Sequence, residues 1–148
     1  MAEDAQADRA EYEDFNQRII AEFREHGGKV GGPFEGMTLA LLTTVGRRSG
    51  QRRTNPVAYL SLDGQPVVIA SKGGAPTHPA WYHNLVANPD VTVEFGTETF
   101  EATAEVLQGD ERDRAFAQVV AMAPGFGDYQ AGTTRVIPVV ALHRRAEG

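Results

Sequence analysis

The arginines between positions 43 and 54 are the feature of the sequence best suited to chemistry. Four of them fall within seven positions, without a carboxylate among them: Arg47, Arg48, Arg52 and Arg53. Guanidinium groups this close together repel one another unless an anion lies between them, and each can hold a phosphate or carboxylate through two hydrogen bonds. Gly46 and Gly50 allow a sharp turn and a close backbone approach to a ligand. The stretch predicts an anion-binding loop between two strands, with a solvated basic turn as the alternative.

Composition limits what else the chain can be. Its 148 residues, 41% of them hydrophobic, suit one domain with a substantial core. The formal net charge of −6 disfavours nucleic acid, so a small anion is the expected partner of the arginines. The absence of cysteine excludes disulfides, thiolate zinc sites and cysteine nucleophiles. We expect a cytoplasmic protein, because no long apolar run or secretory signal is evident.

Residues 1–36 are predicted to form an N-terminal amphipathic helix and a following loop. Apolar side chains recur at helical spacing between Ala7 and His26, where Gly27 and Gly28 end the pattern. The first 26 residues carry eight acids and three arginines, so stable docking on an anionic membrane is disfavoured. We expect this helix to cover one side of the core, with at most a transient membrane contact.

Residues 37–145 are predicted to form one antiparallel β-barrel domain of the α+β class. The expected strands are 37–45, 54–62, 65–71, 91–95, 99–107 and 136–142, with further helices at 79–88 and 110–123. The segment 124–130 is expected to be a turn. Val67 to Ala70 are apolar in succession, which predicts burial on both faces, and Pro138 predicts an edge or a bulge in the last strand. His78 and His83 lie five positions apart without a nearby acid, so no metal site is expected.

Four motifs in this order resemble the deazaflavin-dependent nitroreductase family. They read TTVGRRSGQRRT, VIASKGG, HPAWYHNLVANP and DYQ, and the resemblance extends from about Gly36 to His143. It implies a split β-barrel of the flavin-binding type. The implied cofactor is coenzyme F420, an 8-hydroxy-5-deazaflavin with a phosphate and an oligoglutamate tail.

The resemblance also implies which residues bind the coenzyme. Those expected at the phosphate and tail are Arg47, Arg48, Ser49, Gly50 and Arg53, within a loop that includes Gln51 and Arg52. Those expected near the deazaflavin ring are Asn55, Pro56, Val57, Ile69, Ala70, Ser71, Lys72, Trp81 and Asn84. The substrate pocket would contain Ala58, Phe126 and Tyr129, where nitro-activating relatives carry several tyrosines, so activation of nitro-drugs is in doubt.

The implied reaction is hydride transfer from C5 of the reduced deazaflavin to a quinone, nitroaromatic or activated alkene. The protein would supply binding, orientation and a proton, with Tyr129 and Ser71 as the candidate donors. Two alternatives stay open at this point. One is an oxidoreductase that uses flavin mononucleotide, whose phosphate the arginines would also bind, and the other is a deazaflavin-binding protein without catalysis. Split barrels often dimerise, so a homodimer is also possible.

Overall fold

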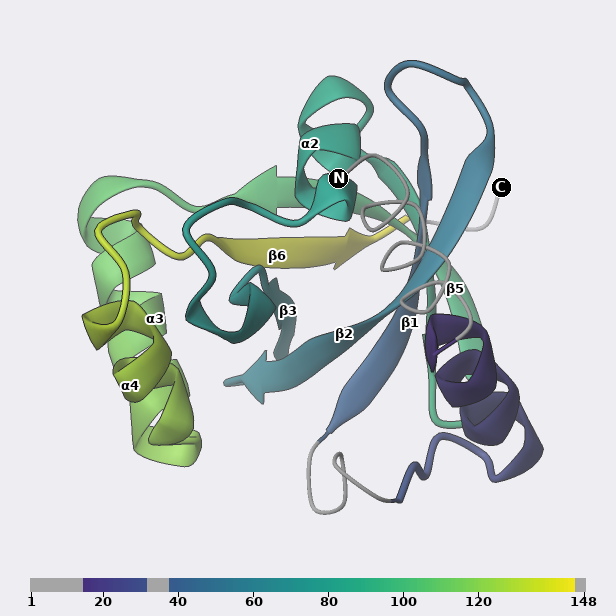
Figure 1. Cartoon of the computed structure of the whole chain (residues 1–148), viewed down its shortest axis with the longest axis horizontal. Helices are drawn as coiled ribbons and strands as arrows, with labels where there is room; N and C mark the ends of the chain where they lie inside the picture. The colour runs from purple at the N-terminus through teal and green to yellow at the C-terminus, as the bar shows by residue number, and fades with distance from the viewer. Residues whose placement is uncertain (1–14, 32–37, 146–148) are drawn as a thin grey trace, which may run out of the picture.

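A computed structural model describes residues 15–31 and 38–145. Its six strands close into an antiparallel barrel in the order β1-β2-β3-β6-β5-β4 (Figure 1). The strands are β1 (Leu39–Val45), β2 (Arg52–Leu62), β3 (Gln65–Ile69), β4 (Asp90–Phe95), β5 (Glu98–Val106) and β6 (Val139–Arg144). The prediction of an antiparallel barrel is confirmed.

The first three strands form the predicted meander. Asp63 and Gly64 turn β2 into β3 with φ angles of 53° and 84°, the left-handed values that a tight two-residue hairpin needs. The barrel closes through two pairings between strands far apart in the chain, β3 with β6 and β1 with β4. The long β1–β2 hairpin extends beyond the barrel at the top of Figure 1, next to α2 (Ala80–Ala87).

β3 is buried on both faces, as its apolar run predicts. Val68 and Ala70 belong to the core inside the barrel, whereas Val67 and Ile69 belong to a second cluster outside it. The outer cluster packs beneath α3 (Gly109–Met122) and α4 (Gly125–Ala131). The barrel wall therefore has an apolar layer on each side at this point.

The N-terminal helix, residues 15–25, lies on the opposite side of the barrel from α3 and α4 (Figure 1). Its apolar face packs on β1 through Ile19, Ile20 and Phe23, which contact a cluster that includes Leu39 and Leu41. The prediction that this helix covers one side of the core is confirmed for these residues. Residues 7–14 of the predicted helix lie outside the described part of the chain.

The segment 124–130 was predicted to be a turn, and this prediction is wrong. It forms most of helix α4, so the described chain has one helix more than expected. Pro124, Gly125 and Gly127 are the residues that favour a turn, but Phe126 is only 7% exposed in the outer cluster. Tertiary packing of this side chain outweighs the weak local preference.

Several predicted strand boundaries differ from the structure. β2 begins at Arg52 rather than Thr54, and β3 ends at Ile69, before Ser71. The last strand is Val139–Arg144, so Pro138 precedes it instead of lying within it. β6 is not an edge strand, since it pairs with both β3 and β5. Proline is tolerated here because it lies outside the ladder, where its carbonyl accepts a 3.1 Å hydrogen bond from the Ala70 amide.

Candidate active site

The β1–β2 loop is a tight turn with its shape fixed by backbone hydrogen bonds. The amide of Gly46 donates to the carbonyl of Gln51 at 2.7 Å, and the amide of Gly50 donates back to the carbonyl of Gly46 at 2.8 Å. Gly50 has a φ of +70°. A Cβ atom at position 46 would lie 2.5 Å from Oγ of Ser49, which accepts a hydrogen bond from the Gln51 amide. The left-handed backbone favours glycine at position 50, and a side chain at position 46 would displace the Ser49 hydroxyl from this turn.

Asn84, on α2, anchors the loop to the barrel. Its Oδ1 accepts a 3.1 Å hydrogen bond from the backbone amide of Arg47, and its Nδ2 donates to Oγ1 of Thr44 at 3.2 Å. Asn84 is 9% exposed and Thr44 is 1% exposed. This largely buried bridge holds the arginine-bearing turn in one position relative to α2.

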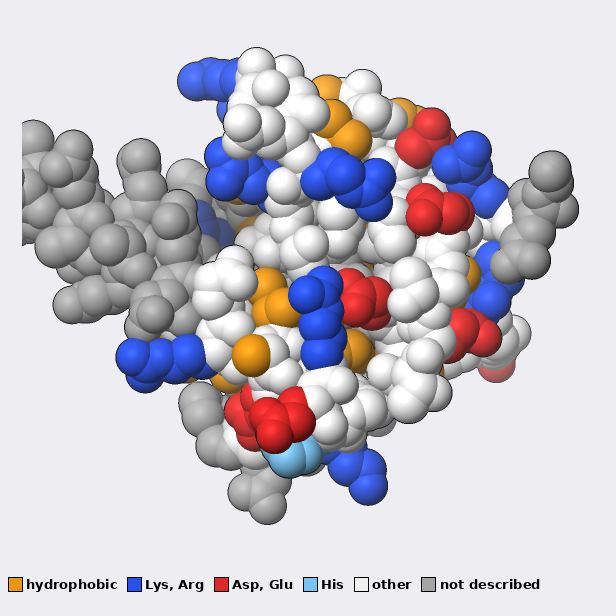
Figure 2. Space-filling view, turned by 90° about the vertical axis from the view of Figure 1, so that its right-hand side faces the viewer, with side chains coloured by type: hydrophobic (Ala, Val, Ile, Leu, Met, Phe, Trp, Pro, Cys, Tyr) orange, Lys and Arg blue, Asp and Glu red, His pale blue; other side chains and the backbone are white. Residues whose placement is uncertain are grey.

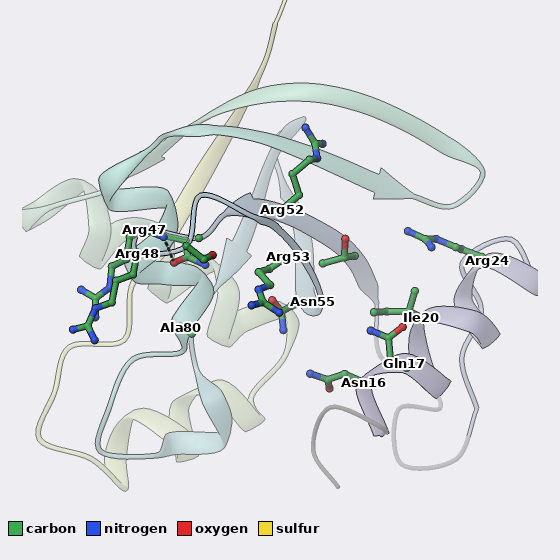
Figure 3. A pocket seen from close by; sticks show the side chains of 14 residues that line it. Asn16, Gln17, Ile20, Arg24, Arg47, Arg48, Arg52, Arg53, Asn55 and Ala80 are labelled. Atoms are coloured by element: carbon green, nitrogen blue, oxygen red, sulfur yellow. Dashed lines mark hydrogen bonds between the residues drawn. The ribbon is translucent and has the colours of Figure 1, made fainter. Parts of the chain in front are cut away.

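A groove of about 750 Å³ lies between the β1–β2 hairpin, α2 and the N-terminal helix. Figure 3 shows the hairpin arginines on one side and Asn16, Gln17 and Arg24 of the N-terminal helix on the other. Arg53, Asn55, Val57 and Tyr59 occupy alternate positions of β2, so their side chains point to the same side of the strand. Val57 and Tyr59 lie in the barrel core, and Arg53 and Asn55 line the groove. The groove thus opens at one end of the barrel core.

The groove is strongly basic. Among the described residues, no aspartate or glutamate lines it, whereas five arginines do: Arg24, Arg47, Arg48, Arg52 and Arg53. Elsewhere on the surface several charged side chains form ion pairs, as in Arg144 with Glu98 and Arg145 with Asp90. Basic and acidic side chains are correspondingly interleaved on the right-hand part of the face in Figure 2. Although the formal net charge of the protein is −6, the positive charge gathered in this groove allows it to bind an anion there.

The four hairpin arginines have few partners, in contrast to Arg24, which pairs with Glu94. Arg52 Nη2 donates to Oγ1 of Thr92 at 2.8 Å, and Arg53 Nη2 reaches Oε1 of Gln51 only at 3.5 Å. Within the described ranges, no side-chain partner engages the guanidinium of Arg47 or Arg48. Most of the donors on the hairpin are free to bind a ligand.

Comparison with known proteins places this geometry in a family. The model of the F420H(2)-dependent quinone reductase family matches residues 16–144. The chain belongs to this family. An F420H(2)-dependent quinone reductase of Mycobacterium tuberculosis is 40% identical over 127 residues, which cover 83% of this chain and 85% of the relative.

Solved structures agree with this assignment. An F420-H2 dependent reductase (FDR-A) has a TM-score of 0.64 at 39% identity, covering 71% of this chain and 93% of its own. A structure described as a domain-swapped dimer has a TM-score of 0.67 at 32% identity, covering 86% and 95%. The fold is thus that of split-barrel F420-dependent reductases.

Membership of the F420H(2)-dependent quinone reductase family makes the protein an oxidoreductase that uses reduced coenzyme F420. This decides against flavin mononucleotide and against a non-catalytic binding protein. The residues present fit such a coenzyme, because the groove is lined by five guanidinium groups and four carboxamides, and by no carboxylate from residues 15–31 or 38–145. A phosphate followed by glutamates is the anion that this set of donors matches.

The structure brings together only some of the residues that the family resemblance implies. Those that line the groove are Arg47, Arg48, Ser49, Arg52, Arg53, Asn55 and Asn84. Gly50 and Gln51 shape the loop without lining the groove, and Pro56 is half-buried on β2. Val57, Ala70 and Trp81 lie in the barrel core, where Trp81 is 7% exposed. Ile69, Ala58 and Phe126 belong to the outer apolar cluster.

Ser71, Lys72 and Tyr129 form a second group outside the groove, where the chain that follows β3 meets α4. Ser71 is 8% exposed and Tyr129 is 36% exposed. A Cβ atom at Gly74, which has a φ of +81°, would lie 3.0 Å from the carbonyl oxygen of Tyr129. The short 3-10 helix η2 (Lys72–Gly74) is therefore packed against α4, next to Tyr129. Lys72 has a φ of 47°, a strained value for a residue with a side chain.

Arg135 fixes the chain that carries Ser71 and Lys72. Its Nη2 donates to the Ser71 carbonyl at 2.6 Å, its Nη1 to the Ala70 carbonyl at 3.1 Å and its Nε to the Ala75 carbonyl at 2.7 Å. Nη1 also lies 3.1 Å from Nδ1 of His78. Burial, followed by repulsion from Arg135 and His83, holds the pKa of His78 below its usual value. The neutral ring can then accept from Arg135.

Sequence reasoning missed the groove residues outside the hairpin and α2. These are Asn16, Gln17, Ile20 and Arg24 of the N-terminal helix. Gly46 and Thr54 of the hairpin and Ala80 of α2 also line the groove, although they were not among the expected coenzyme contacts. The available signal was the spacing of Asn16, Ile20 and Arg24, four apart, which puts them on one helix face at the border of the apolar stripe.

Two features are absent from the part of the chain that the structure describes. No helix there is long and apolar enough to cross a membrane. No group of three or more histidines and acids is arranged there to hold a metal ion. His78 and His83 instead contact each other edge to face, with ring centroids 5.8 Å apart.

Proposed function

We propose that this protein transfers a hydride from reduced coenzyme F420 to a quinone, with the coenzyme's phosphate and tail in the basic groove. The observation that carries the proposal is the set of five arginines, with no carboxylate from the described part of the chain, that lines one groove of a chain in the F420H(2)-dependent quinone reductase family. The 40% identical relative is an F420H(2)-dependent quinone reductase, which supports a quinone as the acceptor. Nitroaromatics and activated alkenes are proposed as slower acceptors.

The length of the groove supports a ligand that continues beyond one phosphate. Arg47 and Arg48 lie near α2, whereas Arg24 lies on the N-terminal helix at the other side of the groove (Figure 3). A single phosphate is satisfied by a few donors, whereas glutamates that follow it present a series of carboxylates. We therefore place the phosphate at the hairpin and the tail toward the N-terminal helix.

The deazaflavin ring is proposed to lie at the α2 end of the groove. The lining there includes Ala80, the first residue of α2, and Asn55 on β2. The chain from Ala80 back to Ser71 leads to the contact between Gly74 and Tyr129. This orientation would put the redox-active end of the coenzyme near the two candidate proton donors.

When bound, the coenzyme would supply the hydride. The residues of this chain would bind and orient the coenzyme and the acceptor and donate a proton to the acceptor. Tyr129 is the better candidate donor, because its ring packs edge to face on Phe126 at 5.8 Å between centroids and stays 36% exposed. Ser71 is 8% exposed, and its position is set through its carbonyl by Arg135. If Tyr129 is the donor, Tyr129→Phe lowers kcat about a hundredfold while the Kd of the coenzyme stays within twofold. An unchanged kcat would remove this role.

The test of the function is an acceptor screen. Oxidation of reduced F420 is followed spectroscopically with a soluble quinone, a nitroaromatic compound and an activated alkene, with NADPH and reduced flavin mononucleotide as alternative donors. We expect turnover with the F420 donor and the highest kcat/KM with the quinone. A higher kcat/KM with either other acceptor, or turnover with reduced flavin alone, would overturn the proposal.

We also propose that the enzyme acts in the cytoplasm and forms a homodimer. The support for a dimer is the related structure described as a domain-swapped dimer, which this chain matches over 86% of its length. The apolar face of the N-terminal helix, Ile19, Ile20 and Phe23, is buried on the barrel and is thus unavailable for stable membrane insertion. Light scattering after size-exclusion chromatography tests the dimer, and a monomer mass would contradict it.

A further inference from the structure

The N-terminal helix is fixed on the barrel rather than loosely attached to it. Ile19, Ile20 and Phe23 are at most 5% exposed. Arg24 forms two hydrogen bonds with Glu94 on β4, from Nε at 3.0 Å and from Nη2 at 2.8 Å. This bidentate pair and the apolar contacts set both the position and the rotation of the helix.

The rotation of the helix turns two carboxamides toward the groove. Asn16 and Gln17 line it together with Ile20 and Arg24, opposite the hairpin arginines (Figure 3). Asn16 is 8% exposed although its side chain is polar. Neither carboxamide forms a side-chain hydrogen bond with another residue in the ranges 15–31 and 38–145. Polar groups in such a position are normally satisfied, by water or by a ligand.

The two walls of the groove differ in chemistry. The hairpin wall carries four arginines with few partners, whereas the charge of Arg24 on the helix wall is already neutralised by Glu94. What remains on the helix wall is a pair of neutral groups, each with donors and an acceptor. Guanidinium groups match carboxylates, and carboxamides match the N–H and C=O groups of amide bonds.

We propose that Asn16 and Gln17 bind the amide backbone of the coenzyme's oligoglutamate tail, so that the N-terminal helix makes coenzyme affinity depend on the tail. This inference rests on the placement of the tail in the basic groove under the proposed function. The hairpin arginines neutralise the phosphate and carboxylates, while the helix contacts the amide groups between them. The N-terminal helix is then part of the binding site, not only a cover of the core.

The test compares two forms of the oxidised coenzyme by isothermal titration calorimetry. One form carries the oligoglutamate tail, and the other carries the phosphate without glutamates. We expect Gln17→Ala to raise the Kd of the tailed form about fivefold and to leave the Kd of the tail-free form within twofold. The same pattern is expected for Asn16→Ala. Glu25→Gln, an exposed change on the same helix at a residue that does not line the groove, should leave both values within twofold.

The outcomes separate this inference from the proposed function. Arg47→Ala should raise the Kd of both forms, because it removes a contact to the phosphate. If Gln17→Ala leaves the tailed form unchanged, or weakens both forms equally, the role of the helix is overturned. Gln17 is exposed, so this variant is expected to fold, and its melting temperature is measured as a check. Wild-type protein that binds the tailed form but reduces no quinone would overturn the function and leave this inference standing.

Discussion

The hairpin arginines and two arginines outside the groove, Arg112 and Arg135, have the same side chain but differ in how many of its donors are engaged. Arg135 is held by three backbone carbonyls, and Arg112 donates from Nε and Nη2 to the Ile137 carbonyl at 3.1 and 2.8 Å, and from Nη2 to Oε1 of Gln130 at 2.8 Å. The arginines of the hairpin use few of their donors. A guanidinium saturated by carbonyls stabilises the fold, and one left with open donors beside others of its kind is available for an anion.

The largest expected effect is a loss of folding stability, at an arginine that is buried and whose guanidinium donors are engaged by protein acceptors. The Arg112 side chain is 11% exposed, and its removal leaves the Ile137 carbonyl without these two bonds. Arg112→Ala should lower the free energy of unfolding by about 3 kcal/mol. The melting temperature should fall by roughly 6 to 12 °C, measured by circular dichroism. Arg114→Ala, an exposed change on the same helix, is the control, and an equal loss there would contradict the comparison.

Removing the hairpin arginines should weaken coenzyme binding and leave folding stability nearly unchanged. Arg47→Ala with Arg48→Ala is expected to change the free energy of unfolding by less than about 0.5 kcal/mol, since these side chains are exposed. Coenzyme binding should weaken by about 2 kcal/mol, or about 30-fold in Kd. The dependence of Kd on salt should decrease as well. Arg114→Ala removes the same charge elsewhere, so a similar loss of affinity with that variant would point to net charge rather than to the groove.

Asn84 is expected to contribute both to folding stability and to coenzyme binding. Because it joins the loop to Thr44 through a buried bridge and also lines the groove, Asn84→Ala should affect both stability and binding. We expect about 1 kcal/mol less stability and about a fivefold higher coenzyme Kd. Thermal melting and calorimetric titration of the same preparation measure both values. A change in only one of them would assign Asn84 to one role.

The smallest effect concerns His78 beside Arg135. Its folded pKa lies below the ordinary value of 6.5, so the unfolded chain takes up a proton first as the pH falls. Stability contributed by the neutral ring is therefore present above about pH 6.5 and decreases as the pH falls toward the folded pKa. His78→Asn keeps an acceptor for Arg135 without titrating. Melting curves at pH 7.5 and 5.5 should differ less in the variant, and an equal pH dependence would exclude His78 as a contributor.

The hairpin arginines could be predicted because their evidence is local. Four cations, two glycines and no carboxylate within a few positions already define a loop for an anion. Arg135 could not be identified in this way, because it is a single cation in the sequence and its partners lie near positions 70–78. Asn16 and Gln17 were missed because only the docking of the helix on β1 turns them toward the hairpin.

Other differences between the predicted and the observed structure also arise from tertiary packing. Helix α4 depends on the burial of Phe126, which a window of proline and glycine does not reveal. Trp81 was expected beside the coenzyme, and the structure places it in the barrel core with Leu85 from the same helix. Its neighbour on that helix face, Asn84, does reach the groove. Helical spacing predicts that two residues share a face, but not how far each extends from the core.

Closure of the barrel also has a consequence for folding kinetics. Val67 pairs with Ala141 and Leu42 with Val93, so neither closing contact can form until long stretches of chain have come together. Topologies dominated by such distant pairings fold on the order of milliseconds to seconds. Trp81 lies on α2, between the first three strands and the β4–β5 hairpin in the chain, and it belongs to a core cluster with residues from all six strands. We therefore expect its full burial only when the barrel closes. Its fluorescence should therefore change late in refolding, after the two hairpins have formed.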